Sequence, residues 1–445
     1  MIEIFSIFTQ LFIITIFCYV PTSICLFLKS NKNPDILNRL EIGIILNLFV
    51  LLILSFSLRS GSNTIYYVLI IIFLNNLLFL SKDIFQKYKG QNLRIDYIFL
   101  FFIFLFFVFS IDLSNNLKIG WDAQNYWLVK KLVFTNGGDF FDLKNTPRND
   151  YPYLGSFVWH IYSKFSILRY EYFGRLFYLY LFLLSIFSVA SIIKIKNFEK
   201  VMLIFVLIFL IYKIDLFNGY QEILNFSLLI LLTKIFYEIF TNKLSIKKFD
   251  NKFIYLLILI NSILWIKSEG TVLIAIFLLS MVLMNQINFK IKIIITLVFI
   301  SLLLYKYYIF NFIGLSHEIQ KGNYEYFKIY DFFDFVSFSR IILVVKYLLF
   351  YSLNNVIYIL TIFILMVMTK HDKKNIFILP FSLMFILGLG FFMSAFLFTS
   401  FPLKWVLWVS LDRIMFETSG LYVILVPIFY DFLKRKKFII VSRFL

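Results

Sequence analysis

Long apolar runs alternate with short polar segments along the whole chain. Runs of roughly 20 hydrophobic residues recur from end to end, and this is the length that crosses the hydrocarbon core of a bilayer as a helix. The pattern predicts an all-α, polytopic membrane protein with about 12–13 spans. The predicted spans lie near residues 4–28, 41–58, 64–81, 95–112, 172–193, 201–214, 220–240, 253–266, 271–285, 292–312, 353–369, 376–397 and 416–433.

The largest interruption is a polar, aromatic-rich stretch over residues 119–162. It divides one integral membrane domain, residues 1–445, into successive parts. These are the N-terminal spans (1–112), a first large loop (113–171), the central spans (172–312), a second large loop (313–352), and the C-terminal spans with a basic tail (353–445). No attached soluble domain is evident, so chemistry is expected in the loops.

The composition supports a polytopic membrane protein, and the positions of the basic residues indicate its orientation in the membrane. The 445 residues are 61% hydrophobic and only 15% charged, with a net charge of +18. Lysines and arginines concentrate on alternate connections, including residues 82–94, 243–252 and 434–437. By the positive-inside rule these connections are cytoplasmic, and both large loops face the outer side. The charge is therefore an orientation signal, and nucleic acid is not needed as a partner.

Asp122 directly follows the fourth predicted span, after Gly120 and Trp121. Residues 126–133 interleave apolar and aromatic side chains with two lysines, which predicts a helix in the headgroup layer. Asp122 would then lie at the membrane surface, although an ordinary helix-capping aspartate explains it equally well. A Tyr-Pro turn at residues 151–155 ends the loop and, taken alone, indicates only the start of a second surface helix.

Two further acidic segments follow spans on the same outer side. Residues 265–270 read Trp-Ile-Lys-Ser-Glu-Gly and interrupt a pair of short apolar segments. Ionisable groups at membrane depth cost about 2.5–3.5 kcal/mol each and suggest function, but a mutual Lys267–Glu269 pair at a tight hairpin is the simpler alternative. Glu222 begins the seventh span within a Gly-Tyr-Gln-Glu sequence, where the helix dipole alone would favour an acid.

A late arginine completes the set. Arg413 follows Asp412 after two tryptophans, and an interfacial anchor would explain the group without chemistry. Its guanidinium could also bind a phosphate through a fixed fork of donors. The three histidines are scattered without metal-site spacing, and there is no glycine-rich phosphate loop.

Taken in order, these motifs resemble the GT-C class of polytopic glycosyltransferases. They are most similar to bacterial members related to protein mannosyltransferases and lipid A aminoarabinose transferases. The resemblance covers residues from about 120 to 415 and rests on the shared order and sidedness of short motifs. It implies transfer of a sugar from a polyprenyl-phosphate carrier to a glycan, lipid or protein acceptor, at the outer face of the bacterial cytoplasmic membrane.

The resemblance and the chemistry of sugar transfer assign roles to these residues. An acceptor hydroxyl must lose a proton, so a carboxylate base is required. The leaving lipid phosphate gains charge, so preplaced cations lower the barrier. The expected catalytic carboxylates are Asp122, Glu222 and Glu269, with Asp122 as the base, and the expected substrate-binding residues are Trp121, Trp127, Tyr153, Lys267 and Arg413. Single displacement would invert the anomeric centre, and we expect these side chains to share one cavity.

Departures from the family and other function classes remain. The family usually has an acidic pair in the first loop and an Asp in the Gly-Tyr-x-acid segment, whereas here Ala123 follows Asp122 and the later acid is Glu222. No cofactor is therefore assigned, and a divalent metal stays an open question. A lipid-linked oligosaccharide polymerase or ligase would close both large loops over one cavity. A flippase or transporter would bury charged residues midway along several helices, in pseudo-symmetric halves, and the sequence shows neither feature.

Overall fold

The computed structural model describes residues 2–29, 35–56, 62–90, 96–213, 216–241, 251–284, 287–315, 337–371, 377–399 and 401–441. Within these ranges every regular element is helical, as the apolar runs predict. The helices are α1 (Ile2–Phe17), α2 (Thr22–Lys29), α3 (Ile36–Phe56), α4 (Ser62–Gly90), α5 (Tyr97–Asn115), η2 (Ala123–Trp127), α6 (Leu128–Thr135), η3 (Asp142–Asn145), α7 (Leu154–Lys164), α8 (Tyr172–Ala190), α9 (Asn197–Ile211), α10 (Glu222–Thr241), α12 (Asn251–Ile266), α13 (Glu269–Val282), α14 (Phe289–Ile313), α16 (Phe338–Asn354), α17 (Val356–His371), α18 (Ile378–Leu397), α19 (Leu403–Ser419) and α20 (Leu425–Val441).

Several of these helices can cross a membrane. Six in the described ranges are long and apolar enough, namely α3, the Thr64–Asp83 part of α4, α5, α8, α14 and α18, and the pair α16–α17, bent by 91°, is a further candidate. The chain is therefore a multi-pass helical membrane protein. Helices α12 and α13 have 16 and 14 residues. They are about 21–24 Å long, shorter than a hydrocarbon core of about 30 Å. The expected 12–13 spans remain a prediction.

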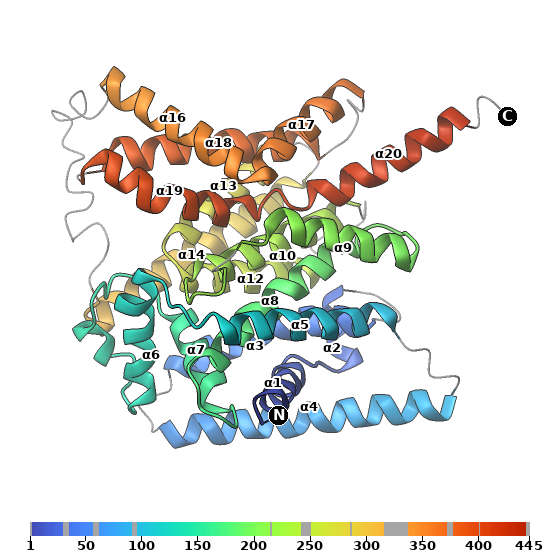
Figure 1. Ribbon diagram of the computed structural model, residues 1–445, viewed down its shortest axis with the longest axis vertical. Helices are drawn as coiled ribbons and strands as arrows, with labels where there is room; N and C mark the ends of the chain where they lie inside the picture. The colour runs from blue at the N-terminus through green and yellow to red at the C-terminus, as the bar shows by residue number, and fades with distance from the viewer. Residues whose placement is uncertain are drawn as a thin grey trace.

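Helix α8 forms the centre of the bundle. All 19 of its residues are buried, because it packs against α3, α5, α7 and α10. A helix that is hydrophobic all round belongs in such an interior position. Figure 1 shows α8 between α5 and α10, with the C-terminal helices α16 to α19 stacked beyond them.

The two ends of the bundle carry different parts of the chain. Figure 1 shows α6 and α7 at one end and the C-terminus at the other. Lys434 Nζ donates to Glu199 Oε2 at 2.7 Å, which joins the C-terminal part of α20 to the start of α9. Asn251 Nδ2 donates to the Phe27 carbonyl oxygen at 2.9 Å, which joins the start of α12 to the end of α2. Each contact joins helix ends that flank the basic connections. We call the opposite end, which carries α6 and α7, the loop end.

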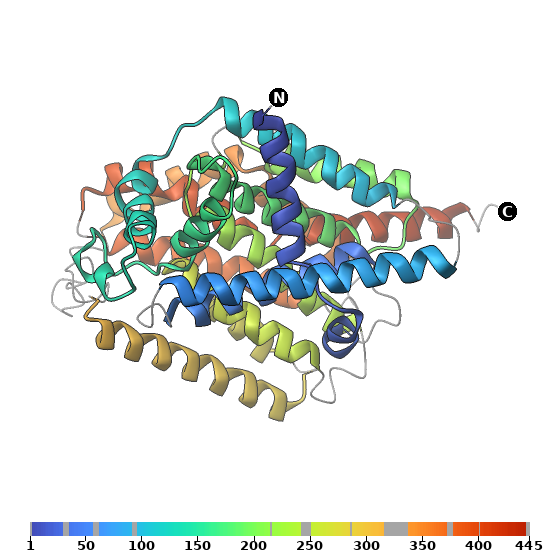
Figure 2. The same ribbon diagram turned by 90° about the horizontal axis from the view of Figure 1, so that it is seen from below.

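The first predicted span, residues 4–28, is wrong as a single helix. Helix α1 ends at Phe17 and α2 begins at Thr22. Pro21 lies between them, and its missing N–H and fixed φ break the helical ladder. Figure 2 shows α1 running across α4 rather than along it. Gly43 on α3 permits the end of α1 to approach α3 closely, because a Cβ there would lie 1.7 Å from the Cys18 carbonyl oxygen.

The last predicted span, residues 416–433, is also wrong. Helix α19 ends at Ser419, and a turn at residues 420–424 precedes α20. Hydropathy does not reveal this break, because residues 421–424 of the turn are themselves apolar and buried. As a result Glu417, expected inside a span, lies on the last turn of α19. The second large loop is partly helical, since α16 occupies residues 338–354, and residues 316–336 lie outside the described ranges.

Candidate functional site

Ion pairs join four distant segments of the chain at the loop end of the bundle. Asp122 directly precedes η2, Glu222 is the first residue of α10, Lys267 lies between α12 and α13, and Arg413 is on α19. The first and last of these residues are 291 positions apart. Five residues selected from the sequence therefore meet in one place, because Glu269 joins them through Lys267.

Arg413 connects the first loop to α10. Its Nη1 lies 2.5 Å from Asp122 Oδ2 and 3.6 Å from Glu222 Oε1. The guanidinium carbon is 4.6 Å from the centre of the Tyr220 ring, a cation–π contact. Burial acts to lower the pKa of Arg413, but the charges of Glu222 and Asp122 outweigh it and raise that pKa. The guanidinium is thus a permanently charged bridge between two carboxylates.

Lys267 is the second cation, and it is almost fully buried. Its Nζ lies 3.1 Å from Glu222 Oε1, 2.9 Å from Glu269 Oε1 and 3.2 Å from Glu417 Oε2. Asn225 Nδ2 donates to the other oxygen of Glu417 at 2.8 Å. Burial acts to lower the pKa of Lys267, but the three carboxylates hold it well above its ordinary value. The ammonium is therefore the centre of a charged cluster. We call this cluster the ion network; it consists of Asp122, Glu222, Lys267, Glu269, Arg413 and Glu417.

Arg175 fixes the two chain segments that carry the acids. It is fully buried on α8, and its Nη1 donates to the carbonyl oxygens of Lys118 at 3.3 Å and Phe217 at 2.8 Å. Its Nε and Nη2 bind both oxygens of Glu171 at 2.9 and 2.8 Å. One guanidinium thus anchors the backbone four residues before Asp122 and five residues before Glu222.

A backbone contact continues this connection. The Gly120 N–H donates to the Asn218 carbonyl oxygen at 2.9 Å. A Cβ on Gly120 would lie 2.4 Å from the Tyr220 ring, so only glycine allows the two segments to approach this closely. The Tyr220 ring in turn lies under the Arg413 guanidinium. The Gly-Trp-Asp and Gly-Tyr-x-Glu sequences are therefore packed against each other.

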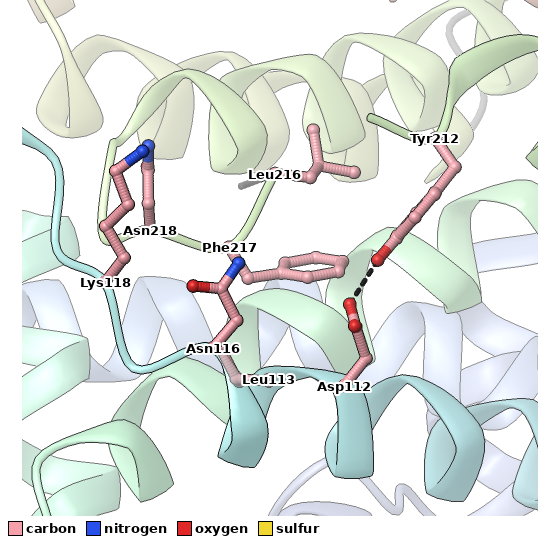
Figure 3. A pocket seen from close by; sticks show the side chains of 8 residues that line it. All are labelled: Asp112, Leu113, Asn116, Lys118, Tyr212, Leu216, Phe217 and Asn218. Carbon is pink, nitrogen blue, oxygen red and sulfur yellow. Dashed lines mark hydrogen bonds between the residues drawn. The ribbon is translucent and has the colours of Figure 1, made fainter. Parts of the chain in front are cut away.

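A small pocket lies beside these segments, between the end of α5 and the turn that leads into α10. Figure 3 shows its lining side chains, with the Phe217 ring between Lys118 and Asn218 on one side and Asp112 and Tyr212 on the other. The Tyr212 hydroxyl donates to Asp112. None of the ion-network residues lines this pocket, so the site is defined by its charges rather than by this hollow.

The contacts decide between the alternatives that the sequence leaves open. Asp122 makes no side-chain capping bond to the helix that follows it, because its carboxylate binds Arg413. Lys267 does pair with Glu269, but it also contacts acids from α10 and α19, so it is more than a hairpin pair. Asp412 pairs with Lys213 at 3.1 Å and does not hold Arg413.

The three aromatic residues expected to stack on a sugar have different positions. Trp121 is 64% exposed. Trp127 and Tyr153 are buried: Trp127 stacks on Tyr151 with ring centres 5.3 Å apart, and the Tyr153 ring packs edge-on against Trp265. Core packing covers both rings, so the stacking of Trp127 and Tyr153 on a sugar stays a prediction.

Sequence reasoning missed three residues of this region. Glu417 contacts Lys267, Asn225 holds Glu417, and Arg175 anchors the backbone. An ionisable residue inside an apparently apolar run is the signal in the sequence for Glu417, because such groups are costly in a membrane. Asn225 and Arg175 act through contacts between helices that no short motif encodes.

The described residues do not form a metal site. No group of three or more His, Cys, Asp or Glu side chains in these ranges is arranged to hold a metal ion. The Lys267 ammonium contacts the three carboxylates that could otherwise have converged on a cation.

Several buried acceptor atoms in and beside the ion network have no hydrogen-bond donor. Among the described residues, Glu222 Oε2, Glu269 Oε2 and Asn225 Oδ1 are buried and accept no hydrogen bond from the protein. Buried acceptors of this kind are costly unless a donor reaches them. Within the same ranges Arg413 Nη2 makes no hydrogen bond, since Nε donates to the Val409 carbonyl oxygen and Nη1 to Asp122. The site thus offers acceptors for hydroxyl groups and a donor for an anion. Comparison with known protein families, with curated proteins and with solved structures found no match for the chain.

Proposed function

We propose that this protein is a membrane glycosyltransferase of the GT-C type, which moves a sugar from a polyprenyl-phosphate donor to an acceptor at the extracytoplasmic face of the bacterial cytoplasmic membrane. The observation that carries the proposal is the ion network. Asp122, Glu222, Lys267, Glu269 and Arg413 come from separate loops and helix ends, yet they are in contact at one end of an apolar bundle.

The chemistry of the network suits a phosphorylated sugar. Glu222 Oε2 and Glu269 Oε2 can accept hydrogen bonds from sugar hydroxyls, and Arg413 Nη2 can donate to a phosphate oxygen. The lipid tail of such a donor is soluble in the bilayer that surrounds the bundle. A donor whose tail lies in the bilayer can therefore place its phosphate and sugar at a site near the ends of the membrane helices.

Each step of the transfer has a residue to perform it. Asp122 Oδ2 is held by Arg413, while Oδ1 accepts no hydrogen bond among the described residues and can take the proton of an acceptor hydroxyl. The acceptor oxygen then attacks the anomeric carbon as the bond from this carbon to the phosphate oxygen breaks. The phosphate leaves with the bonding electron pair, and Arg413 and Lys267 stabilise its charge. Asp122 finally releases its proton to water, and the anomeric centre is inverted.

The test is sugar transfer with defined donors. Purified protein is supplied with labelled polyprenyl-phosphate hexoses and pentoses, and the transfer rate of Asp122→Asn is compared with that of the wild type. We expect a loss of about 10²–10⁴-fold, the contribution of a general base, with donor binding kept. Arg413→Ala should instead weaken donor binding by about 1.5–3 kcal/mol, the value of a charge-assisted hydrogen bond.

Asp112→Asn is the matched control, because Asp112 lies in the neighbouring pocket and outside the ion network. It should transfer sugar at close to the wild-type rate. If Asp122→Asn, Glu222→Gln and Glu269→Gln all keep full activity with every donor that the wild type uses, carboxylate-based transfer at this site must be abandoned.

A transporter is the second candidate, because one observation favours it. Lys234 on α10 pairs with Glu41 on α3, and both side chains are almost completely buried within helices. Ser188 on α8 donates to the same carboxylate. A transporter is expected to bury charged residues midway along several helices, and such groups mark ion pathways in many transporters. Loss of lipid or glycan movement across vesicles in Lys234→Met, with sugar transfer absent from the wild type, would favour this alternative.

A further inference from the structure

A row of three aromatic rings begins next to Asp122. Trp121 and Tyr126 meet edge to face with ring centres 5.7 Å apart, and Tyr126 meets Tyr151 in the same way at 6.0 Å. Trp121 is largely exposed and Tyr126 is half-buried. We call Trp121, Tyr126 and Tyr151 the aromatic row. It extends from the proposed base along the loop end of the protein.

The row is held by a buried cation and a stacked ring. Lys130 Nζ donates to the carbonyl oxygens of Arg148 at 2.8 Å and Tyr151 at 2.6 Å. The same ammonium lies 5.4 Å from the centre of the Trp127 ring, which stacks on Tyr151. Trp127 and Lys130 are both buried. These contacts fix the position of Tyr151: Lys130 binds its backbone, and Trp127 stacks on its ring.

Local helix geometry orients Tyr126 between the other two rings of the aromatic row. Residues 123–127 form a π-helical turn directly after Asp122, and the N–H of Leu128 reaches back to the Ala123 carbonyl oxygen. Single π turns carry one extra residue and occur frequently at functional sites. Here the turn places Tyr126 between Trp121 and Tyr151, while Asp122 still contacts Arg413.

Arg148 ends the row in an unusual backbone conformation. Its φ is +49°, the one positive value for a non-glycine residue in the described ranges. Its guanidinium carbon lies 4.2 Å from the centre of the Tyr151 ring, and its Nη2 is 3.0 Å from Asp150 Oδ2. A residue in this region costs of order 1–3 kcal/mol and persists where its surroundings fix it. The side chain is thereby held over the row instead of extending into water.

Two arginine–aspartate pairs therefore surround Tyr126. Burial raises the pKa of the Tyr126 hydroxyl, and the charges of Asp122, Arg148, Asp150 and Arg413 also act on it. The hydroxyl stays protonated and can both donate and accept a hydrogen bond. Flat apolar rings bordered by charged, hydrogen-bonding groups match a sugar ring, which has an apolar C–H face and polar hydroxyls at its edge.

We infer that the aromatic row is the acceptor subsite, and that the acceptor is a saccharide whose ring packs on Trp121 and Tyr126 beside Asp122. This inference rests on the proposed function, because it assigns the cations to the donor. Lys267 and Arg413 reach the ion network from the α12–α13 break and from α19, whereas the row belongs to the loop that carries the base. A glycan entering along the row presents its hydroxyl to Asp122 from the water side.

An exposed tryptophan in a membrane protein commonly belongs to the aromatic belt at the membrane–water interface. Trp408 on α19 provides the matched comparison, since it is 69% exposed, close to the value for Trp121. It belongs to neither the ion network nor the aromatic row. A belt function would make the two tryptophans equivalent, whereas an acceptor subsite makes Trp121 alone important for saccharide binding.

The experiment measures saccharide binding separately from transfer. Purified full-length protein in detergent is titrated with methyl glycosides and disaccharides of glucose, galactose, mannose and N-acetylglucosamine, and binding is followed by saturation-transfer NMR. We expect the wild type to bind at least one of them, and Trp121→Ala and Tyr126→Ala to weaken it at least about tenfold. Tyr126→Phe keeps the ring and should bind more tightly than Tyr126→Ala, and Trp408→Ala should bind like the wild type.

Two outcomes overturn the acceptor subsite. These are the absence of binding to every saccharide by the wild-type protein, and an equal loss in Trp121→Ala and Trp408→Ala. Donor hydrolysis by water, measured on the same variants with labelled polyprenyl-phosphate sugars, separates this inference from the proposed function. Hydrolysis without saccharide binding removes the subsite and leaves the glycosyltransferase. Saccharide binding that depends on Trp121, with neither donor hydrolysis nor transfer to the bound saccharide, removes the glycosyltransferase and leaves a saccharide-binding site.

Discussion

Replacing Lys267 with methionine removes the ammonium at the centre of the ion network and keeps the length of the side chain. Glu222, Glu269 and Glu417 then face one another without the cation that lies 2.9–3.2 Å from each of them. Lys267 is 6% exposed, so water compensates little. Breaking a buried ion pair by removing one partner costs about 3–5 kcal/mol, and we expect a loss of this size in the free energy of unfolding.

A double-mutant cycle identifies the source of that loss. Glu417→Gln alone leaves Lys267 with two carboxylates and should cost about 1–3 kcal/mol, because it disturbs a buried charge-assisted contact. In the Lys267→Met background Glu417 has lost its cation, and burial already raises the pKa of its carboxyl group to about 7, so the same change should have little effect on stability. The coupling free energy between the two positions should therefore be about 1–3 kcal/mol.

The assay is unfolding of the purified protein by sodium dodecyl sulfate in mixed micelles, followed by circular dichroism. Lys434→Met is the control, because Lys434 pairs with Glu199 at 2.7 Å but is 48% exposed. Its stability should not change measurably. A Lys267→Met protein as stable as the wild type would refute the reasoning, because it would mean that the three carboxyl groups carry no net charge in the folded protein.

Three further predictions concern other parts of the molecule. Burial and two nearby lysines lower the pKa of His160 to about 3, so the folded protein binds fewer protons than the unfolded chain between pH 3 and 6.5, and stability should fall by about 2 kcal/mol from pH 7 to pH 5. An equal drop in His160→Gln would contradict this. Gly43→Ala should destabilise the protein by about 1–3 kcal/mol in thermal unfolding, because the new methyl group overlaps the Cys18 carbonyl. In a cysteine-free background, an impermeant thiol reagent added to intact cells should label Asn145→Cys but not Lys196→Cys, and the reverse pattern would invert the proposed orientation.

Hydrophobic runs locate the central helices well. The run at residues 172–193 corresponds to α8 and that at 292–312 to α14, with ends that differ by three residues or fewer. A helix that is buried on all sides and a helix that faces lipid both require such runs of hydrophobic residues. The same signal fails at residues 4–28 and 416–433, because a break inside a buried apolar segment changes the path of the chain without changing its hydropathy.

The candidate site was only partly accessible from the sequence. Asp122, Glu222 and Lys267 stand out because charged groups at the ends of apolar runs need partners. Which partner each one takes depends on how the helices cross, and this is why the Glu417–Lys267 contact and the Arg175 anchor emerge only in three dimensions. Aromatic side chains in the first loop look alike in the sequence, and only packing separates exposed Trp121 from buried Trp127.

The π-helical turn at residues 123–127 makes the length of this segment as important as its composition. Its extra residue lets Asp122 contact Arg413 on one side while Lys130 binds the backbone of Arg148 and Tyr151 on the other. Deleting one residue here would restore an ordinary α-helix and rotate everything upstream by about 100° around the helix axis. The carboxylate would then leave its arginine although every side chain of the ion network was still encoded. Homologues that share this site should therefore vary in the identity of residues 124 and 125 more readily than in the number of residues in this turn.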